Sequence, residues 1–130
     1  MSVFETRVPV RYRDLDPMGH VNNAVYATYV ETAREAFFRE EVGTSLAETD
    51  AALAALSVEF HAPIHDGATV LVETHVEAIG ETSCTFAHRL SVDGDRVADA
   101  ETTLVTVDDG EPRPLPARLR TALERYEGEP

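Results

Sequence analysis

Apolar and polar residues alternate along the first part of the chain, between residues 4 and 13. One face holds mainly apolar side chains and the other holds charged residues and a proline: Phe4, Thr6, Val8, Val10 and Tyr12 against Glu5, Arg7, Pro9, Arg11 and Arg13. A period of two predicts a strand that is buried on one face only. Because Pro9 has no N–H to donate to a neighbouring strand, we expect this strand to lie at the edge of a sheet.

A helical period of apolar residues follows in the next segment. Residues on one stripe recur every three or four positions: Tyr26, Tyr29, Val30, Ala33 and Phe37. This spacing predicts a long helix over 24–41 that packs heavily on a sheet. Either Asn22 or Asn23 can cap its start, and Gly43 is a natural stop.

The second half of the chain contains three further alternating segments, which predict strands over 70–78, 83–92 and 96–107. The sequence Asp93-Gly94-Asp95, between the last two, is a strong hairpin signal. Consecutive strands joined by tight turns pair antiparallel, so these segments predict an antiparallel meander.

The segment between the long helix and the meander is less clear. Residues 57–61 alternate like a strand, whereas 51–56 are alanine and leucine, which favour helix by propensity. A short amphipathic helix is predicted near 118–126, after a proline-rich connector. The element order predicts an α+β fold, with one long helix on a mainly antiparallel sheet. We expect one domain over 1–130, with a frayed tail after about residue 126.

Composition and charge limit the kinds of molecule that we expect this protein to bind. The formal net charge is −13, and all 11 basic residues are arginine. An acidic chain does not suit nucleic acid, so we expect no nucleic-acid partner. The spread of the acidic residues favours adaptation to high salt over a coding bias that replaces lysine by arginine. No apolar run is long enough to span a membrane, and no secretory signal is evident, so we expect a cytoplasmic protein with no membrane partner.

The residues with the most chemistry lie in one run, Asp14-Leu15-Asp16-Pro17-Met18-Gly19-His20-Val21-Asn22-Asn23. The run joins the first strand to the long helix. A turn followed by a helix start offers free backbone N–H groups, which hold an anionic or polarised oxygen. A carboxylate on such a turn can take a proton from water or attack a carbonyl. The run therefore supplies both a base and an electrophilic stabiliser.

This run, with Tyr26, Tyr29 and the later Glu31-x-Ala33-Arg34, resembles the motif of hotdog-fold acyl-CoA thioesterases, in particular the 4-hydroxybenzoyl-CoA thioesterase-like group. The resemblance implies a hotdog fold, in which a five-stranded antiparallel sheet wraps a long central helix. It also implies a homodimer or homotetramer whose sheets join edge to edge, with active sites at the subunit interface. Hydratases of the same fold carry Asp-x-Asn-Pro-x-His, which this chain lacks.

The resemblance also assigns roles to residues. It places the catalytic carboxylate on Asp16 and the backbone N–H that polarises the thioester carbonyl near Asn23. His20 is a third catalytic candidate, which we expect to shape the site; its alternative roles are to orient the turn, to touch the substrate, or to be a core histidine. The residues expected to contact substrate are Gly19, Asn22, Tyr26, Glu59 and His61. The chemistry requires no metal and no cofactor, because the CoA thioester is itself the substrate.

The residues alone leave other roles open. Asp16-Pro17 is an ordinary turn dipeptide, and one of the two asparagines can be only a helix cap. Tyr26 is typical of a core stripe. Glu59 and His61 share one side of a strand. A partner subunit could present them to the thioester, but their residue types favour a solvated sheet face.

Other candidates have weaker signals. Asp14 suits a solvated or arginine-paired position at a strand end, and Glu31 suits either the site or a charged helix face. His75 and His88 lack the spacing of zinc ligands, and Cys84 fits a small core residue. Four arginines are candidates for contact with CoA phosphates: Arg11, Arg13, Arg89 and Arg118.

These features predict an acyl-CoA thioesterase. The alternative is a hotdog module that binds acyl-CoA or another lipid-like ligand without catalysis. Hydrolysis of a thioester on acyl carrier protein is a third possibility, which the acidic surface disfavours because such carriers are themselves usually acidic.

Overall fold

The computed structural model describes residues 2–46 and 48–128. The strands are β1 (Phe4–Pro9), β2 (Ala51–Phe60), β3 (Thr69–Ile79), β4 (Ser83–Val92), β5 (Asp95–Asp108) and the short β6 (Glu111–Pro112). The helical elements are η1 (Tyr12–Asp14), α1 (Val25–Phe37), η2 (Phe38–Val42) and α2 (Ala117–Arg125).

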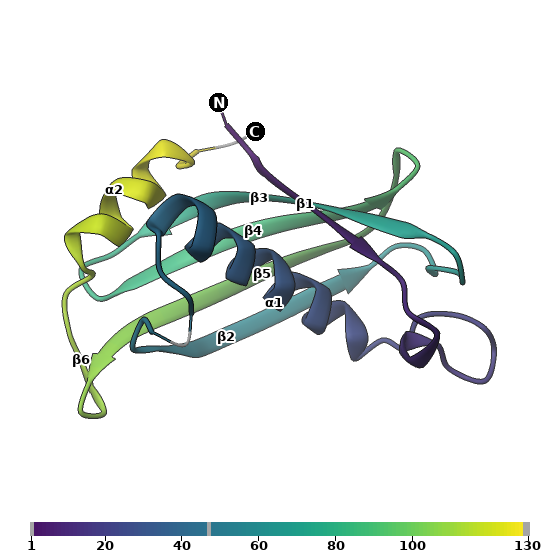
Figure 1. Cartoon of the computed structure of the whole chain (residues 1–130), viewed down its shortest axis with the longest axis horizontal. Helices are drawn as coiled ribbons and strands as arrows, with labels where there is room; N and C mark the ends of the chain where they lie inside the picture. Colours follow the sequence, from purple (N-terminus) through teal and green to yellow (C-terminus); the bar gives the residue numbers. More distant parts are fainter. Residues whose placement is uncertain (1, 47, 129–130) are drawn as a thin grey trace.

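Five strands form one antiparallel sheet in the order β1-β3-β4-β5-β2, and β6 pairs with the end of β5. The sheet curls around α1, which lies across one of its faces (Figure 1). α2 covers the end of the sheet opposite the segment that joins η1 to α1 (Figure 1). This architecture confirms the predicted α+β hotdog fold, with a long central helix and a short C-terminal helix.

The core lies between α1 and the sheet. Phe37 is fully buried, and its ring makes edge contacts with four others: Phe4, Phe38, Phe86 and Tyr126. The helix therefore packs on the edge strand β1 and the middle strand β4 through one aromatic cluster, and Phe37 lies at its centre. Cys84 is buried in the same cluster, as predicted.

The long helix ends at Gly43, as the sequence predicts. η2 is a π-helical turn that continues α1 to Val42, and Gly43 then takes a φ of 90°. A side chain at Gly43 would collide with the Arg118 guanidinium, which donates to the Val42 carbonyl oxygen at 3.0 Å. The glycine thus serves both the backbone turn and the packing of α2 on the helix end.

Two segments differ from their sequence prediction. The first strand ends at Pro9 rather than continuing to Arg13, and Tyr12 is 88% exposed instead of facing the core. The reason is local, because the Asp14 carboxylate accepts from the Arg11 backbone N–H at 2.8 Å and folds the chain into η1. Residues 51–56 form a strand, because pairing with β5 overrides the helical propensity of alanine and leucine.

The expected frayed tail is also partly wrong. Glu127 bridges to Val76 of β3, and the Gly128 N–H donates to the Val76 carbonyl oxygen at 3.0 Å. Residues 129 and 130 lie outside the described residues. Within the described ranges, no helix is long and apolar enough to cross a membrane.

A buried histidine lies under α1. The His88 ring lies between the hydroxyls of Thr74 and Thr102, with its Nδ1 at 3.0 Å from the first and its Nε2 at 2.9 Å from the second. Burial lowers the pKa of His88 to about 3, and the positive charge of Arg34 acts in the same direction. The folded protein therefore holds a neutral imidazole that becomes protonated on unfolding at mildly acidic pH.

We expect His88 to make the protein acid-sensitive. Since the pKa of His88 is lower in the folded state, its neutral ring contributes fully to the free energy of unfolding above about pH 6.5. This contribution is lost as the pH falls toward 3. The free energy of unfolding should fall about 1.4 kcal/mol per pH unit more steeply in the native chain than in His88→Gln. Urea titrations between pH 6.5 and 4.5 measure this difference, and equal slopes would contradict it.

Candidate active site

The loop before α1 is folded around Asp16. Its carboxylate Oδ1 accepts from the backbone N–H groups of Met18 at 2.9 Å and His20 at 3.2 Å. Its own N–H donates to the His20 carbonyl oxygen at 2.7 Å. Gly19, with a φ of 80°, supplies the left-handed residue of the turn. Asp16 is therefore a turn former in this chain, and its half-buried side chain is held in a fixed direction.

Asp14 anchors the loop to the helix. It is 2% exposed, and its Oδ2 accepts from the Arg11 N–H and from the Tyr29 hydroxyl, both at 2.8 Å. Burial alone would raise the pKa of Asp14, but these hydrogen bonds and the Arg11 charge outweigh it and lower the pKa. Asp14 is thus paired with arginine, one of the two predicted roles, and is not solvated.

At the start of α1, the backbone N–H of Asn23 is left free. The Asn22 side chain accepts from the Ala24 N–H at 2.9 Å, so Asn22 has the capping role. The Asn22 N–H donates to the Asp14 carbonyl oxygen, and the Val25 N–H donates to the Asn22 carbonyl oxygen. The Asn23 N–H has no hydrogen-bond partner among residues 2–46 and 48–128. It is therefore free to donate to a bound molecule.

Two other predicted residues pack around this loop. The His20 ring meets the His65 ring edge-on, with centroids 4.8 Å apart. Tyr26 is only 2% exposed, its hydroxyl donates to the Ala62 carbonyl oxygen at 3.3 Å, and its ring contacts Phe60. Tyr26 is thus a core residue in the single chain, and it offers little surface to a substrate.

Glu31 lies on the exposed side of α1, close to a buried cation. The Arg34 side chain is 6% exposed, and its Nη2 lies 4.0 Å from Glu31 Oε2. Its Nε has no hydrogen-bond partner in the part of the chain that the structure describes. Glu31 therefore partly compensates a buried charge, which favours the charged-face interpretation of this residue.

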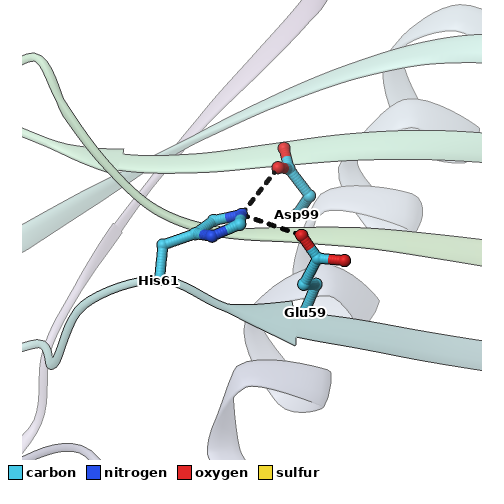
Figure 2. Close-up of side chains that lie close together, drawn as sticks. All are labelled: Glu59, His61 and Asp99. Carbon is cyan, nitrogen blue, oxygen red and sulfur yellow. Dashed lines mark hydrogen bonds and ion pairs between the residues drawn. The ribbon is translucent and has the colours of Figure 1, made fainter.

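Glu59 and His61 lie together with Asp99 on the face of the sheet turned away from α1 (Figure 2). His61 Nε2 lies 2.9 Å from Asp99 Oδ2 and 3.6 Å from Glu59 Oε1, and the three ligand-type atoms lie within 4.8 Å of one another. Arg96 Nη2 lies 2.6 Å from Asp99 Oδ2, and Arg89 Nε lies 3.6 Å from Asp99 Oδ1. Two guanidinium groups thus supply positive charge to this cluster.

The sequence did not indicate Asp99 as a member of this cluster. The register that places it opposite Glu59 is visible only once β2 pairs with β5. Within one chain, the described contacts of Glu59 and His61 join them to this cluster and not to the Asp16 loop.

The same outer face is hollowed into an open depression of about 840 Å³. Its lining includes Arg89 and five carboxylates: Glu59, Glu73, Glu77, Asp99 and Glu101. A hydrogen bond with Glu101 raises the pKa of Glu77, as expected where two carboxyl groups share one proton. Asp16, His20 and Asn23 are not among the lining residues, and the excess of negative charge does not suit a phosphate-bearing ligand.

Comparisons with known proteins place this geometry in a family. The sequence profile of the Thioesterase-like superfamily matches residues 10–123. A Thermus thermophilus thioesterase, solved with coenzyme A and Zn, is 37% identical, with a TM-score of 0.87 over 98% of this chain and 96% of that one. A predicted thioesterase from Bacillus stearothermophilus has a TM-score of 0.90 at 25% identity, over 99% of both chains.

A plant relative is similar over most of this chain. The chloroplastic acyl-acyl carrier protein thioesterase ATL2 of Arabidopsis thaliana is 27% identical over 95% of this chain and 69% of its own length. The profile match spans the loop, α1 and the strands from β2 to β6, and the solved relatives share the whole fold. The chain therefore belongs to the Thioesterase-like superfamily.

Proposed function

We propose that this thioester hydrolase cleaves an acyl-CoA into a carboxylic acid and free CoA, with Asp16 and the N-terminus of α1 as its chemical groups. The observation that carries the proposal is the free Asn23 N–H, seven residues after the Asp16 carboxylate, on one hydrogen-bonded loop. Its backbone N–H would donate to the thioester carbonyl oxygen, and Asp16 would act on the carbonyl carbon or on water. His20, Gly19 and Asn22 shape this loop.

Charge develops on the carbonyl oxygen as the tetrahedral state forms. A backbone donor already directed at that oxygen stabilises it, and one such hydrogen bond is often worth about 3 kcal/mol. In one route Asp16 takes a proton from the attacking water, and the tetrahedral state collapses with loss of the CoA thiolate. In the other, Asp16 attacks the carbonyl carbon and expels the CoA thiolate, which leaves a mixed anhydride that water then hydrolyses. The proposal includes no metal and no cofactor in these steps.

CoA is the proposed carrier of the acyl group. The relative with bound coenzyme A shares 37% identity over nearly the full length of both chains, whereas the acyl carrier protein relative shares 27%. The net charge of −13 also disfavours an acidic protein carrier.

A spectroscopic free-thiol assay over acyl-CoAs of graded length, with acyl-acyl carrier protein in parallel, tests the proposal. Thiol release from one class of acyl-CoA is the expected result. Tight binding of acyl-CoA without release would support the non-catalytic alternative, and release from the protein carrier alone would exclude CoA as the substrate carrier.

We also propose that a second copy of the chain completes the site, as a homodimer or a dimer of dimers. β2 is the edge strand of the sheet, and three of its large apolar side chains are 42–47% exposed: Leu53, Leu56 and Phe60. An edge strand with free backbone groups and exposed leucines is suited to pairing with another strand. A partner on β2 would lie beside the strand that carries Glu59, next to the acidic hollow.

Leu56→Arg is expected to weaken this association about 100-fold, because it would bury an uncompensated charge at the interface. Light scattering over a range of protein concentrations measures the change. Thr121→Arg adds the same charge on the exposed side of α2 and should leave the mass unchanged. An unchanged mass for Leu56→Arg would place the interface elsewhere.

A further inference from the structure

Two arginines, one in β1 and one in η1, have guanidinium groups without a partner in the described structure. Six of the 11 arginines lie against carboxylates: Arg11, Arg34, Arg39, Arg89, Arg96 and Arg125. Three more donate to carbonyl oxygens: Arg113, Arg118 and Arg120. Among the arginines within residues 2–46 and 48–128, only Arg7 and Arg13 have neither a side-chain hydrogen bond nor an ion pair, and both are exposed.

These two arginines belong to one of two basic segments in the sequence. The other, from Arg113 to Arg120, also has three arginines and no carboxylate, but each of its guanidinium groups already donates to a carbonyl oxygen. From Thr6 to Arg13 there are three arginines and no carboxylate, in a chain whose net charge is −13. Free guanidinium groups of this kind bind phosphate oxygens, often through two parallel hydrogen bonds. The segment is therefore the part of the described surface best suited to a polyanionic ligand.

Tyr12 lies between Arg11 and Arg13 in the sequence, and its aromatic ring is exposed. The residue is 88% exposed, although the nearby Asp14 is buried. The η1 turn that carries it is held by the Asp14 N–H donating to the Arg11 carbonyl oxygen at 2.9 Å and by the Leu15 N–H donating to the Tyr12 carbonyl oxygen at 3.2 Å. A phenol ring presented on a firmly bonded turn, rather than on a loose loop, is suited to stack on a planar base.

The basic segment is also close to the proposed reacting group. Arg13 precedes Asp16 by three residues, so their Cα atoms lie within about 11 Å of each other. In CoA, the pantetheine arm separates the thioester from a nucleotide that carries phosphates. A ligand with its thioester at Asp16 can therefore extend toward Tyr12 and Arg13, whereas the carboxylates of the outer hollow repel those phosphates.

Resting on the proposed function, we infer that Tyr12, Arg13 and Arg7 form the subsite for the 3′-phosphorylated ADP portion of CoA. The Tyr12 ring stacks on the adenine, and the two guanidinium groups bind the phosphates. Of the four arginines that the sequence offered for this role, Arg89 and Arg118 already have partners, and Arg11 is tied to Asp14. Arg13 is the one that remains free.

The first test uses a nucleotide alone, and so does not depend on catalysis. Adenosine 3′,5′-bisphosphate is titrated into the native chain and into Arg13→Gln by calorimetry at one fixed salt concentration. We expect at least 10-fold weaker binding by Arg13→Gln, and similar weakening by Tyr12→Ala. Arg39→Gln, which removes an exposed arginine paired with Glu35, is the matched control and should bind normally. Equal binding by the native chain and Arg13→Gln would overturn the inference.

The second test separates this subsite from the reaction itself. With acyl-CoA, Arg13→Gln should raise KM about 10-fold with little change in kcat, since the nucleotide does not react. With acyl-pantetheine, which lacks the nucleotide, the variant and the native chain should be equal. An equal rise in KM on both substrates would overturn the inference while leaving the proposed hydrolysis intact. Absence of thiol release by the native chain, with bisphosphate binding retained, would reject the hydrolysis and not the subsite.

Discussion

Asp16→Asn is expected to lower kcat on the best acyl-CoA by 100- to 10,000-fold. An amide can neither take a proton from water nor attack the thioester, and general-base catalysis contributes an effect of this size. The loop should survive the change, because an asparagine Oδ1 can still accept from the Met18 and His20 N–H groups. The initial rate of thiol release, with the thermal midpoint measured in parallel, checks the expectation.

Asp93→Asn is the matched control for this variant. Asp93 lies in the exposed hairpin between β4 and β5 with a φ of 51°, a conformation that asparagine tolerates. The Asp93→Asn variant should retain the native rate of thiol release. An undiminished rate for Asp16→Asn would remove the proposed mechanism. Single-turnover hydrolysis in labelled water then tests for the covalent route, because label that enters the Asp16 carboxylate indicates an anhydride.

Phe37→Ala is expected to lower the free energy of unfolding by about 3–5 kcal/mol. The ring is fully buried and touches four other aromatic rings, so its removal leaves a cavity that rigid neighbours cannot fill. This decrease in the free energy of unfolding has two sources. The variant no longer buries an aromatic ring on folding, and the edge contacts with the other rings are lost. Urea unfolding measures it through the shift in midpoint at constant slope.

Tyr12→Ala provides the comparison for this loss of stability. Its ring is 88% exposed, so its removal should change the free energy of unfolding by less than about 0.5 kcal/mol. A loss of similar size in both variants would mean that the aromatic cluster around Phe37 does not hold the helix on the sheet.

The sequence was sufficient for the parts of the fold with a clear period. The stripe from Tyr26 to Phe37 and the alternation in β3, β4 and β5 correspond to single elements whose burial follows the pattern. The pattern failed at Tyr12, where one buried carboxylate bends the chain out of its strand. It was ambiguous at 51–56, where the partner strand, not local propensity, decides the conformation.

The candidate site also has one part that the sequence predicts and one part that it does not. The motif from Asp14 to Asn23 is local, so its residues and the free N–H at Asn23 could be anticipated from the chain alone. The cluster of Glu59, His61 and Asp99 is not local, since it depends on the register between β2 and β5. The burial of Asp14 and its hydrogen bond from Tyr29 also required the structure, because the sequence left Asp14 as either solvated or paired with arginine.

The buried Asp14 carboxylate has a consequence for the rate of the reaction. Through Arg11 on one side and the Tyr29 hydroxyl on the other, it joins the approach to the loop to the second turn of α1. The proposed base, Asp16, and the proposed donor, the Asn23 N–H, thus lie on one rigid frame, and little positional entropy would be lost on binding of the thioester. A change that breaks the hydrogen bonds of Asp14 would therefore slow turnover, even if Asp16 and the Asn23 N–H were both retained.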